Sequence, residues 1–239
     1  MTRERFLVSV CAAALVLSAA CGSRQATGEA EQAGTSRPEA PPAASAAAPA
    51  QAAPRIVVLG DSLTAGLGLG PDQAYPALLQ QRVNDAGLTY QVVNAGVSGD
   101  TSAGGLSRLD WALEGDVRVL VVALGGNDAL RGLPVAELRG NLSEIIERAV
   151  ARKIAVVLTG MEAPPNFGHQ YTVEFRQVYA DLAKRHGVAL LPFLLDGVAG
   201  IETLNQRDGI HPTAEGARRV ADNVWAVLRP LLEGRSGRT

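Results

Sequence analysis

Five short runs of aliphatic residues recur along the chain, and segments of a different period separate them. The run from Arg55 to Leu59 shows no alternation of polar and apolar positions, which is typical of a strand buried on both faces of a parallel sheet. Between the runs, apolar side chains recur at three- or four-residue spacing, which is typical of amphipathic helices. The pattern predicts strands at 55–60, 90–94, 117–124, 154–159 and 188–191, and helices at 74–83, 106–113, 135–150, 173–184 and 214–232.

Strands that alternate with helices of these lengths predict an α/β fold, with one parallel sheet covered by helices on both faces. Segments 94–105 and 160–170 follow neither period and contain glycine or proline, so we expect loops there. We expect a turn at 125–128, whereas 193–206 is ambiguous between short helices and loop. Thr213 is the expected N-cap of the last helix.

The composition of the first 54 residues differs from that of the rest of the 239-residue chain. Residues 1–21 combine arginines, an apolar run and small residues before Cys21, which is the layout of an export signal and is too short to span a bilayer. Cys21 resembles the cysteine that bacteria lipidate at a lipoprotein cleavage site, although Ser18 stands where that motif usually has leucine. Ordinary cleavage after an Ala-x-Ala-like site is the alternative.

Residues 22–54 are rich in Ala, Pro, Glu, Gln, Ser and Gly and lack large apolar side chains, so we expect a disordered tether. The segment 55–232 is then a single folded domain, followed by a flexible tail at 233–239. The sequence therefore predicts an exported protein, either periplasmic or anchored to a bacterial envelope through a lipid on Cys21.

Charge and cysteine content exclude several classes of function. The formal net charge is −2 and no basic block is interleaved with aromatic residues, so a nucleic acid partner is not expected. Both cysteines precede the predicted domain, which excludes disulfide and thiol chemistry there. Scattered histidines without a cysteine in the domain argue against a metal site, and the chain has no dinucleotide or phosphate-loop motif, so we expect no cofactor.

Loops with uncommon polar residues follow three of the predicted strands. Ser62 follows the first strand, the loop around Gly99 follows the second and Asn127 follows the third, and in a parallel sheet these ends share one edge. Asp208 precedes His211 by three residues, so its carboxylate can hold one imidazole nitrogen and direct the other towards Ser62. The backbone N–H groups of Ser62 and Gly99 and the side-chain amide of Asn127 are candidate donors to an oxyanion.

Simpler interpretations remain open for each position taken alone. Asp61 and the serine after it could only cap a helix, Gly99 could be a turn glycine, and Asn127 could form a local turn. Two other histidines are weaker candidates for a catalytic base. His186 lies at a predicted helix C-terminus, and His169 lies in an irregular loop with no acid nearby.

Four blocks of the sequence contain these residues: Gly60-Asp61-Ser62-Leu63, Ser98-Gly99-Asp100-Thr101, Gly125-Gly126-Asn127-Asp128 and Asp208-Gly209-Ile210-His211-Pro212. In this order they resemble the blocks of the SGNH (GDSL) hydrolase family. Residues 94–102 and 125–132 are most similar to its group of periplasmic acyl-CoA thioesterase I, lysophospholipase and arylesterase enzymes. The resemblance implies a flavodoxin-like, three-layer α/β/α sandwich with Ser62 as nucleophile, His211 as base and Asp208 as its partner. It also implies an oxyanion hole made by Ser62, Gly99 and Asn127.

The favoured function is that of a serine esterase or thioesterase, which cleaves small acyl esters or thioesters without a cofactor. Deacetylation of a cell-envelope polysaccharide is the alternative within that class, and a non-catalytic, surface-tethered binding lipoprotein is the alternative outside it. Segments 129–135 and 161–171 flank the expected edge of the sheet and mix apolar residues with Gly and Pro. We therefore expect Leu130 and Phe167 to line a groove for an aliphatic acyl chain.

Overall fold

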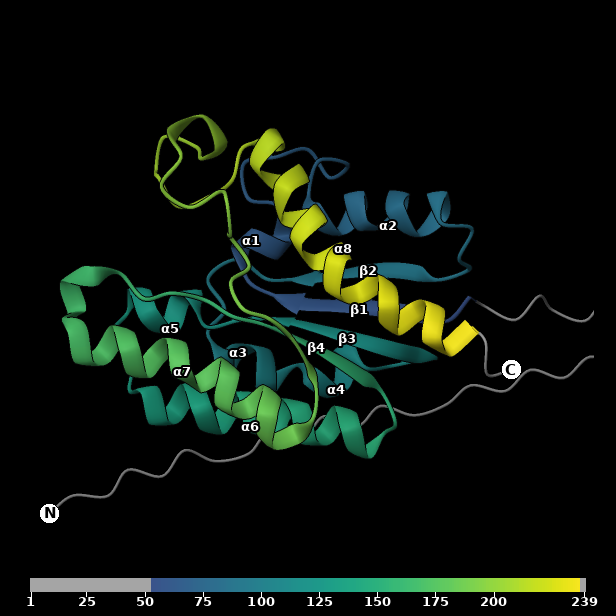
Figure 1. The fold of residues 1–239 in the computed structure, drawn as a ribbon, viewed down its shortest axis with the longest axis horizontal. Coiled ribbons are helices and arrows are strands. Elements are labelled where there is room, and N and C mark those ends of the chain that lie inside the picture. The colour runs from purple at the N-terminus through teal and green to yellow at the C-terminus, as the bar shows by residue number, and fades with distance from the viewer. Residues whose placement is uncertain (1–52, 237–239) are drawn as a thin grey trace, which may run out of the picture. The chain divides into compact units, whose positions relative to one another are not determined.

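The computed structural model of the protein describes residues 53–236 and contains a five-stranded sheet. The strands are β1 (Arg55–Gly60), β2 (Gln91–Gly96), β3 (Val117–Ala123), β4 (Ala155–Thr159) and β5 (Ala189–Leu191). Their order across the sheet is β2-β1-β3-β4-β5, and every neighbouring pair is parallel (Figure 1). The predicted α/β fold with a five-stranded parallel sheet is therefore confirmed.

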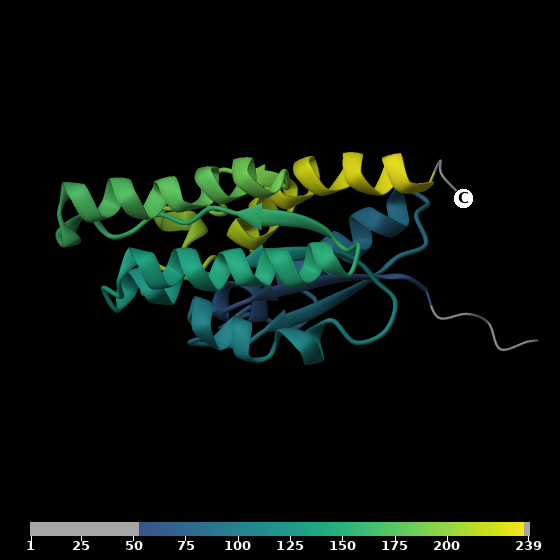
Figure 2. The same ribbon diagram turned by 90° about the horizontal axis from the view of Figure 1, so that it is seen from below.

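Helices cover both faces of the sheet. On one face lie α2 (Tyr75–Asp85) and α8 (Ala214–Ser236), which pack against each other (Figure 1). On the other face, α6 (Val135–Ala151) lies between α3 (Ser102–Ser107) and α7 (His169–His186), as Figure 2 shows from below. The connections contain shorter helical turns: α1 (Ser62–Ala65), α4 (Leu109–Ala112), α5 (Gly126–Leu130), η1 (Pro165–Phe167) and η2 (Glu202–Leu204).

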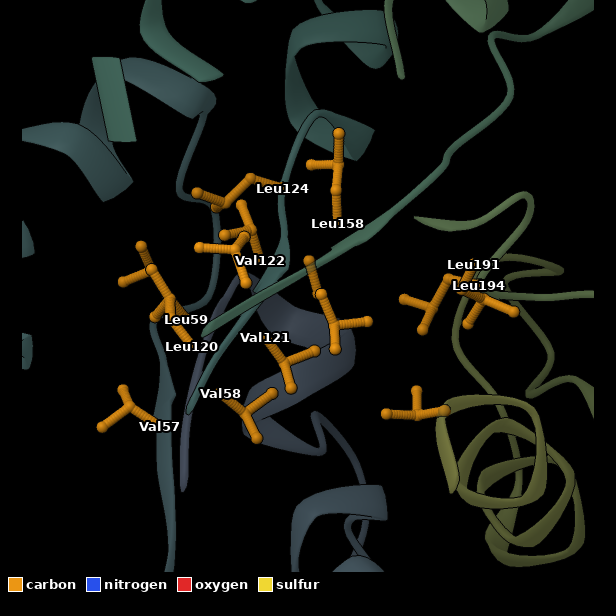
Figure 3. Close-up of a cluster of buried hydrophobic side chains, with 14 of the residues drawn as sticks. Val57, Val58, Leu59, Leu120, Val121, Val122, Leu124, Leu158, Leu191 and Leu194 are labelled. Atoms are coloured by element: carbon orange, nitrogen blue, oxygen red, sulfur yellow. The ribbon is translucent and has the colours of Figure 1, made fainter. Parts of the chain in front are cut away.

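Aliphatic side chains of the central strands form the middle of the core. Residues 56–59 of β1 and 119–122 of β3 are fully buried. Figure 3 shows side chains of both strands together with Leu158, Leu191 and Leu194. The uninterrupted apolar run of β1 therefore reflects burial on both faces, as predicted.

The helix predicted at 106–113 is interrupted in the structure and begins earlier. Two short helices, α3 and α4, occupy this region and meet at Arg108. The Oγ1 of Thr101 accepts a hydrogen bond from the Gly104 N–H at 3.2 Å, which caps α3 well before the predicted start. The glycines that favoured a loop reflect close packing instead, because a Cβ on Gly105 would lie 2.2 Å from Cδ1 of Leu124.

Three further boundaries differ from the prediction. The expected turn at 125–128 contains the start of α5, and α7 begins at His169, inside the expected loop. α8 is capped as predicted, since Oγ1 of Thr213 accepts the N–H of Gly216 at 3.3 Å. It continues through Pro230 to Ser236, so residues 233–236 belong to this helix and not to a tail.

The remaining predictions about the chain ends concern residues that the structure does not describe. The export signal at 1–21, including Cys21, and the tether up to residue 52 lie outside the described residues, as do 237–239. No helix between residues 53 and 236 is long and apolar enough to cross a bilayer.

Candidate active site

Ser62 lies just beyond the end of β1 and is the first residue of α1. Asp61 caps this helix, because its Oδ1 accepts the Leu63 N–H at 3.0 Å. α1 in turn lies close against the end of β2, where a Cβ on Gly96 would stand 2.3 Å from the backbone nitrogen of Ala65. The capping interpretation thus holds for Asp61, whereas the Ser62 hydroxyl faces another loop.

That loop carries His211. Its Nε2 lies 2.9 Å from Oγ of Ser62, and its Nδ1 lies 2.7 Å from Oδ2 of Asp208. The other carboxylate oxygen of Asp208 accepts the backbone N–H groups of Ile210 at 2.9 Å and His211 at 3.0 Å. The structure therefore aligns the three side chains in the order hydroxyl, imidazole, carboxylate, with the imidazole only 15% exposed.

Hydrogen bonding keeps Asp208 ionised. The backbone N–H of His211 contributes most, followed by that of Ile210 and by the imidazole, and together they lower the pKa of the Asp208 carboxyl to about 2. An anionic Asp208 favours a proton on Nδ1 of His211, which leaves Nε2 free to accept the Ser62 proton.

Gln206 joins the His211 loop to the loop that follows α1. Its backbone N–H donates to the His211 carbonyl at 2.7 Å, and its side-chain amide donates to the carbonyls of Pro212 at 2.9 Å and Leu67 at 2.7 Å. Sequence reasoning missed this residue, since a glutamine that binds distant carbonyls leaves no pattern along the chain. The contacts fix His211 relative to the segment that carries Ser62.

The other two histidines lie elsewhere. His186 ends α7, and its Nε2 lies 2.9 Å from Oγ of Ser143 and 3.8 Å from a carboxylate oxygen of Glu147, both on α6. His169 is exposed at the start of α7. Neither contacts Ser62 or Asp208 in the described hydrogen bonds.

Asn127 lies in α5, after β3, and Gly99 lies on the loop after β2. The side-chain amide of Asn127 donates to the Asp100 carbonyl at 3.0 Å and, at 3.3 Å, to Oδ2 of Asp61. Gly99 has a φ of 86°, in the region that favours glycine. Between residues 53 and 236, the backbone N–H groups of Ser62 and Gly99 have no protein acceptor, so both are available to a ligand.

Arg108 connects the ends of β1 and β2. This role was not predicted from the sequence. Its guanidinium donates to the carbonyls of Gly60 and Ala95, each at 2.8 Å, and pairs with the Asp100 carboxylate at 2.6 Å. One side chain thus holds the ends of β1 and β2 and the loop that contains Gly99.

A cavity of about 410 Å³ opens beside Ser62, Asn127 and His211. Most of its wall is apolar: Leu130, Met161, Ala163, Pro164, Pro165, Phe193, Leu195, Ala199 and Ile210. Leu130 lines it as predicted, but Phe167 does not, because its ring packs against Gly132 and Tyr171. The part of the wall between Phe193 and Ile210 was not predicted, since that segment shows no period.

The described residues contain no group of three or more His, Cys, Asp or Glu side chains that could hold a metal ion. Asp61, directly before Ser62 in the chain, also lines the cavity. Asp61 is 3% exposed, and this burial raises the pKa of its carboxyl to about 6, against the opposing effects of the Leu63 N–H, the His211 charge and the Asn127 amide.

Comparisons with known proteins identify relatives along most of the chain. The model of the GDSL-like Lipase/Acylhydrolase family matches residues 58–219. Esterase TesA of Pseudomonas aeruginosa is 47% identical over 182 residues, which cover 76% of this chain and 90% of that protein. Thioesterase 1/protease 1/lysophospholipase L1 of Escherichia coli K12 is 38% identical over 184 residues, covering 77% and 87%. A crystal structure of TesA superposes with a TM-score of 0.72 at 46% identity, covering 74% of this chain and 99% of the other.

The buried Asp61 carboxylate predicts a pH dependence of stability. Its folded-state pKa of about 6 exceeds the ordinary value of 3.8, so between these values the folded protein binds a proton that the unfolded chain does not. Relative to Asp61→Asn, the wild-type free energy of unfolding should therefore rise as the pH falls, by roughly 1.4 kcal/mol per unit between about pH 6 and 4. Urea denaturation of both proteins at roughly pH 7.5, 6 and 4.5 measures the difference. A difference that stays constant with pH would contradict a raised pKa at Asp61.

Proposed function

Because this chain belongs to the GDSL-like lipase/acylhydrolase family, we propose that it hydrolyses acyl esters and thioesters through an acyl-enzyme on Ser62. It is a serine hydrolase that acts on ester bonds, as its esterase and thioesterase relatives indicate. The resemblance seen in four sequence blocks is thereby confirmed at the level of the family. The observation that carries the proposed mechanism is the 2.9 Å contact of His211 with Ser62, with Asp208 behind it.

The proposed reaction uses His211 first as a base and then as an acid. Its Nε2 removes the Ser62 proton while Oγ attacks the acyl carbon, and Asp208 stabilises the imidazolium that forms. The imidazolium then protonates the departing alcohol or thiolate, which leaves the acyl group on Ser62. A water molecule deprotonated by the same imidazole cleaves this ester and releases the acid.

Three donors are available to the oxyanion of each tetrahedral intermediate. The backbone N–H groups of Ser62 and Gly99 have no acceptor in the described protein, so they can bind the oxyanion without breaking a hydrogen bond. The amide of Asn127 makes one shorter bond, to Asp100, and one longer bond at 3.3 Å to Asp61. We propose that the Asn127 amide gives up this longer bond to Asp61 and donates to the oxyanion instead.

The cavity wall supports an aliphatic acyl group. Each methylene buried there contributes about 0.8 kcal/mol. The hydroxyl groups of a sugar would gain less there, because most of the cavity wall is apolar. The apolar wall therefore favours acyl esters over acetylated polysaccharides.

We further propose that the protein is exported and attached to a bacterial envelope by a lipid on Cys21. Two features of the sequence support this proposal. Residues 1–21 have the layout of an export signal, and the following segment, which lacks large apolar side chains, would connect the lipid to the folded domain.

The proposed mechanism predicts the effect of removing the nucleophile. Ser62→Ala should abolish hydrolysis of p-nitrophenyl esters, and a fluorophosphonate should label Ser62 in the wild type, because the His211 imidazole activates that hydroxyl alone. Ser143→Ala is the matched control, since Ser143 also contacts a histidine, His186, and should keep full activity. Chelators should change nothing. Activity that survives in Ser62→Ala, or that disappears with EDTA, contradicts a metal-free serine mechanism.

A second prediction concerns the acyl group. The kcat/KM for p-nitrophenyl esters should rise from acetyl to medium-chain groups, and Leu130→Asp should flatten this rise while sparing acetyl ester turnover, because only burial of the chain is lost. Val150→Asp places the same charge at a comparably exposed apolar position, 46% against 48%, at the far end of α6 and should have no such effect. A wild type that prefers acetyl groups would favour the polysaccharide deacetylase.

The lipid on Cys21 predicts how the full-length chain partitions. Expressed in a bacterium, it should enter the detergent phase, whereas Cys21→Ser should stay in the aqueous phase, because each buried CH₂ of an acyl chain contributes about 0.8 kcal/mol. Mass spectrometry of the mature N-terminus measures the modification directly. An unmodified N-terminus would show ordinary secretion instead.

A further inference from the structure

Two of the donors proposed for the oxyanion, the Gly99 N–H and the Asn127 amide, follow strands that do not pair with each other. Gly99 follows β2 and Asn127 follows β3, and β1 lies between these strands in the sheet. Each of them pairs with β1, so the sheet sets the spacing of the strand ends, but the paired residues end at Gly96 and Ala123, before Gly99 and Asn127. Since an oxyanion requires its donors within about 2.7 to 3.1 Å, other contacts must hold the loops in register.

Three side chains make those contacts, two on α5 and one directly after it. Asn127 donates to the Asp100 carbonyl at 3.0 Å, and Arg131, directly after α5, donates to the Gly99 carbonyl at 2.6 Å. Asp128 accepts twice from Ser102: the backbone N–H at 2.8 Å and the hydroxyl at 2.5 Å. The segment 99–102 is thus bound to α5 at three of its four residues.

Of these contacts with segment 99–102, the one between Asp128 and Ser102 is buried. Asp128 is 1% exposed and Ser102 is fully buried, whereas Arg131 is exposed. Both hydrogen bonds to the carboxylate come from neutral groups, and Asn141 of α6 completes the set by donating to the Ser102 hydroxyl at 2.9 Å. A buried carboxylate held by neutral donors costs desolvation energy, which a neutral pair would avoid.

We propose that Asp128 is a positioning residue for catalysis: it holds Ser102 with both carboxylate oxygens and so fixes the Gly99 N–H relative to the Asn127 amide. This inference rests on the proposed function. Asp128 itself touches neither the substrate nor Ser62. It acts through the loop, because the oxyanion donors lose their hydrogen bonds if the loop shifts by a fraction of an ångström.

The test variant is Asp128→Asn, which keeps the shape but has a single oxygen, so only one of the two Ser102 donors keeps its acceptor. The lost hydrogen bond should loosen the loop and lower kcat for p-nitrophenyl esters by about 10- to 100-fold, with KM changed by less than about threefold. The affinity for an acyl trifluoromethyl ketone, whose adduct with Ser62 carries an oxyanion, should fall by the same factor as kcat/KM. Affinity for the matching unreactive methyl ketone should stay unchanged.

Ser102→Ala is the second variant, in case Asp128→Asn does not fold. It removes only the hydroxyl and leaves the Ser102 N–H on Asp128, so a smaller loss with the same split between kcat and KM is expected. Thr159→Val is the structural control. It removes one buried hydrogen bond, from Thr159 to the Val122 carbonyl at 3.1 Å, and should lower Tm without lowering kcat.

Two results would overturn the inference. Variants at Asp128 and Ser102 that lose Tm as Thr159→Val does but keep kcat and ketone affinity would make the contact purely structural. A rise in KM at constant kcat would place its effect on substrate binding. A wild type that hydrolyses no ester overturns the proposed function and this inference with it, whereas an active wild type with unaffected variants overturns the inference alone.

Discussion

Central strands that run parallel and are buried on both faces confine reactive polar side chains to the loops at the strand ends. In β1 and β3, a charged group would replace side chains that are fully buried, and it would cost several kcal/mol without a partner. The carboxyl ends of all five strands share one edge, so loops far apart in the chain meet there. This explains how His211 comes to contact Ser62, 149 positions before it.

Two aspartates beside the His211 imidazole are held in opposite states by their surroundings. Asp208 is exposed and receives three hydrogen bonds, which lower its pKa to about 2, whereas burial raises the pKa of Asp61 to about 6. Near pH 5, Asp208 therefore remains ionised and can support His211 as the proposed base, while Asp61 is mostly protonated. Asp61 instead serves the local structure, since it caps α1 and accepts from the Asn127 amide.

Features that depend on neighbouring residues could be predicted from the sequence, and those that depend on distant packing could not. The strands follow from aliphatic runs, and the Asp208–His211 contact follows from a spacing that one turn of chain satisfies. The start of α3 was not predicted, because the glycine at position 105 is required by close packing against Leu124, a residue that follows β3. Phe193 and the rest of its cavity wall belong to a segment without a period.

We propose that the aligned hydroxyl, imidazole and carboxylate make Ser62 a nucleophile. The most direct measurement is the intact mass of the protein quenched within the first turnovers of p-nitrophenyl butyrate, followed by peptide mapping. We expect a mass increase of one butyryl group on the peptide that contains Ser62, and its loss on further incubation as water releases the acid. Hydrolysis without any acylated protein, or with the acyl group on another residue, would contradict it.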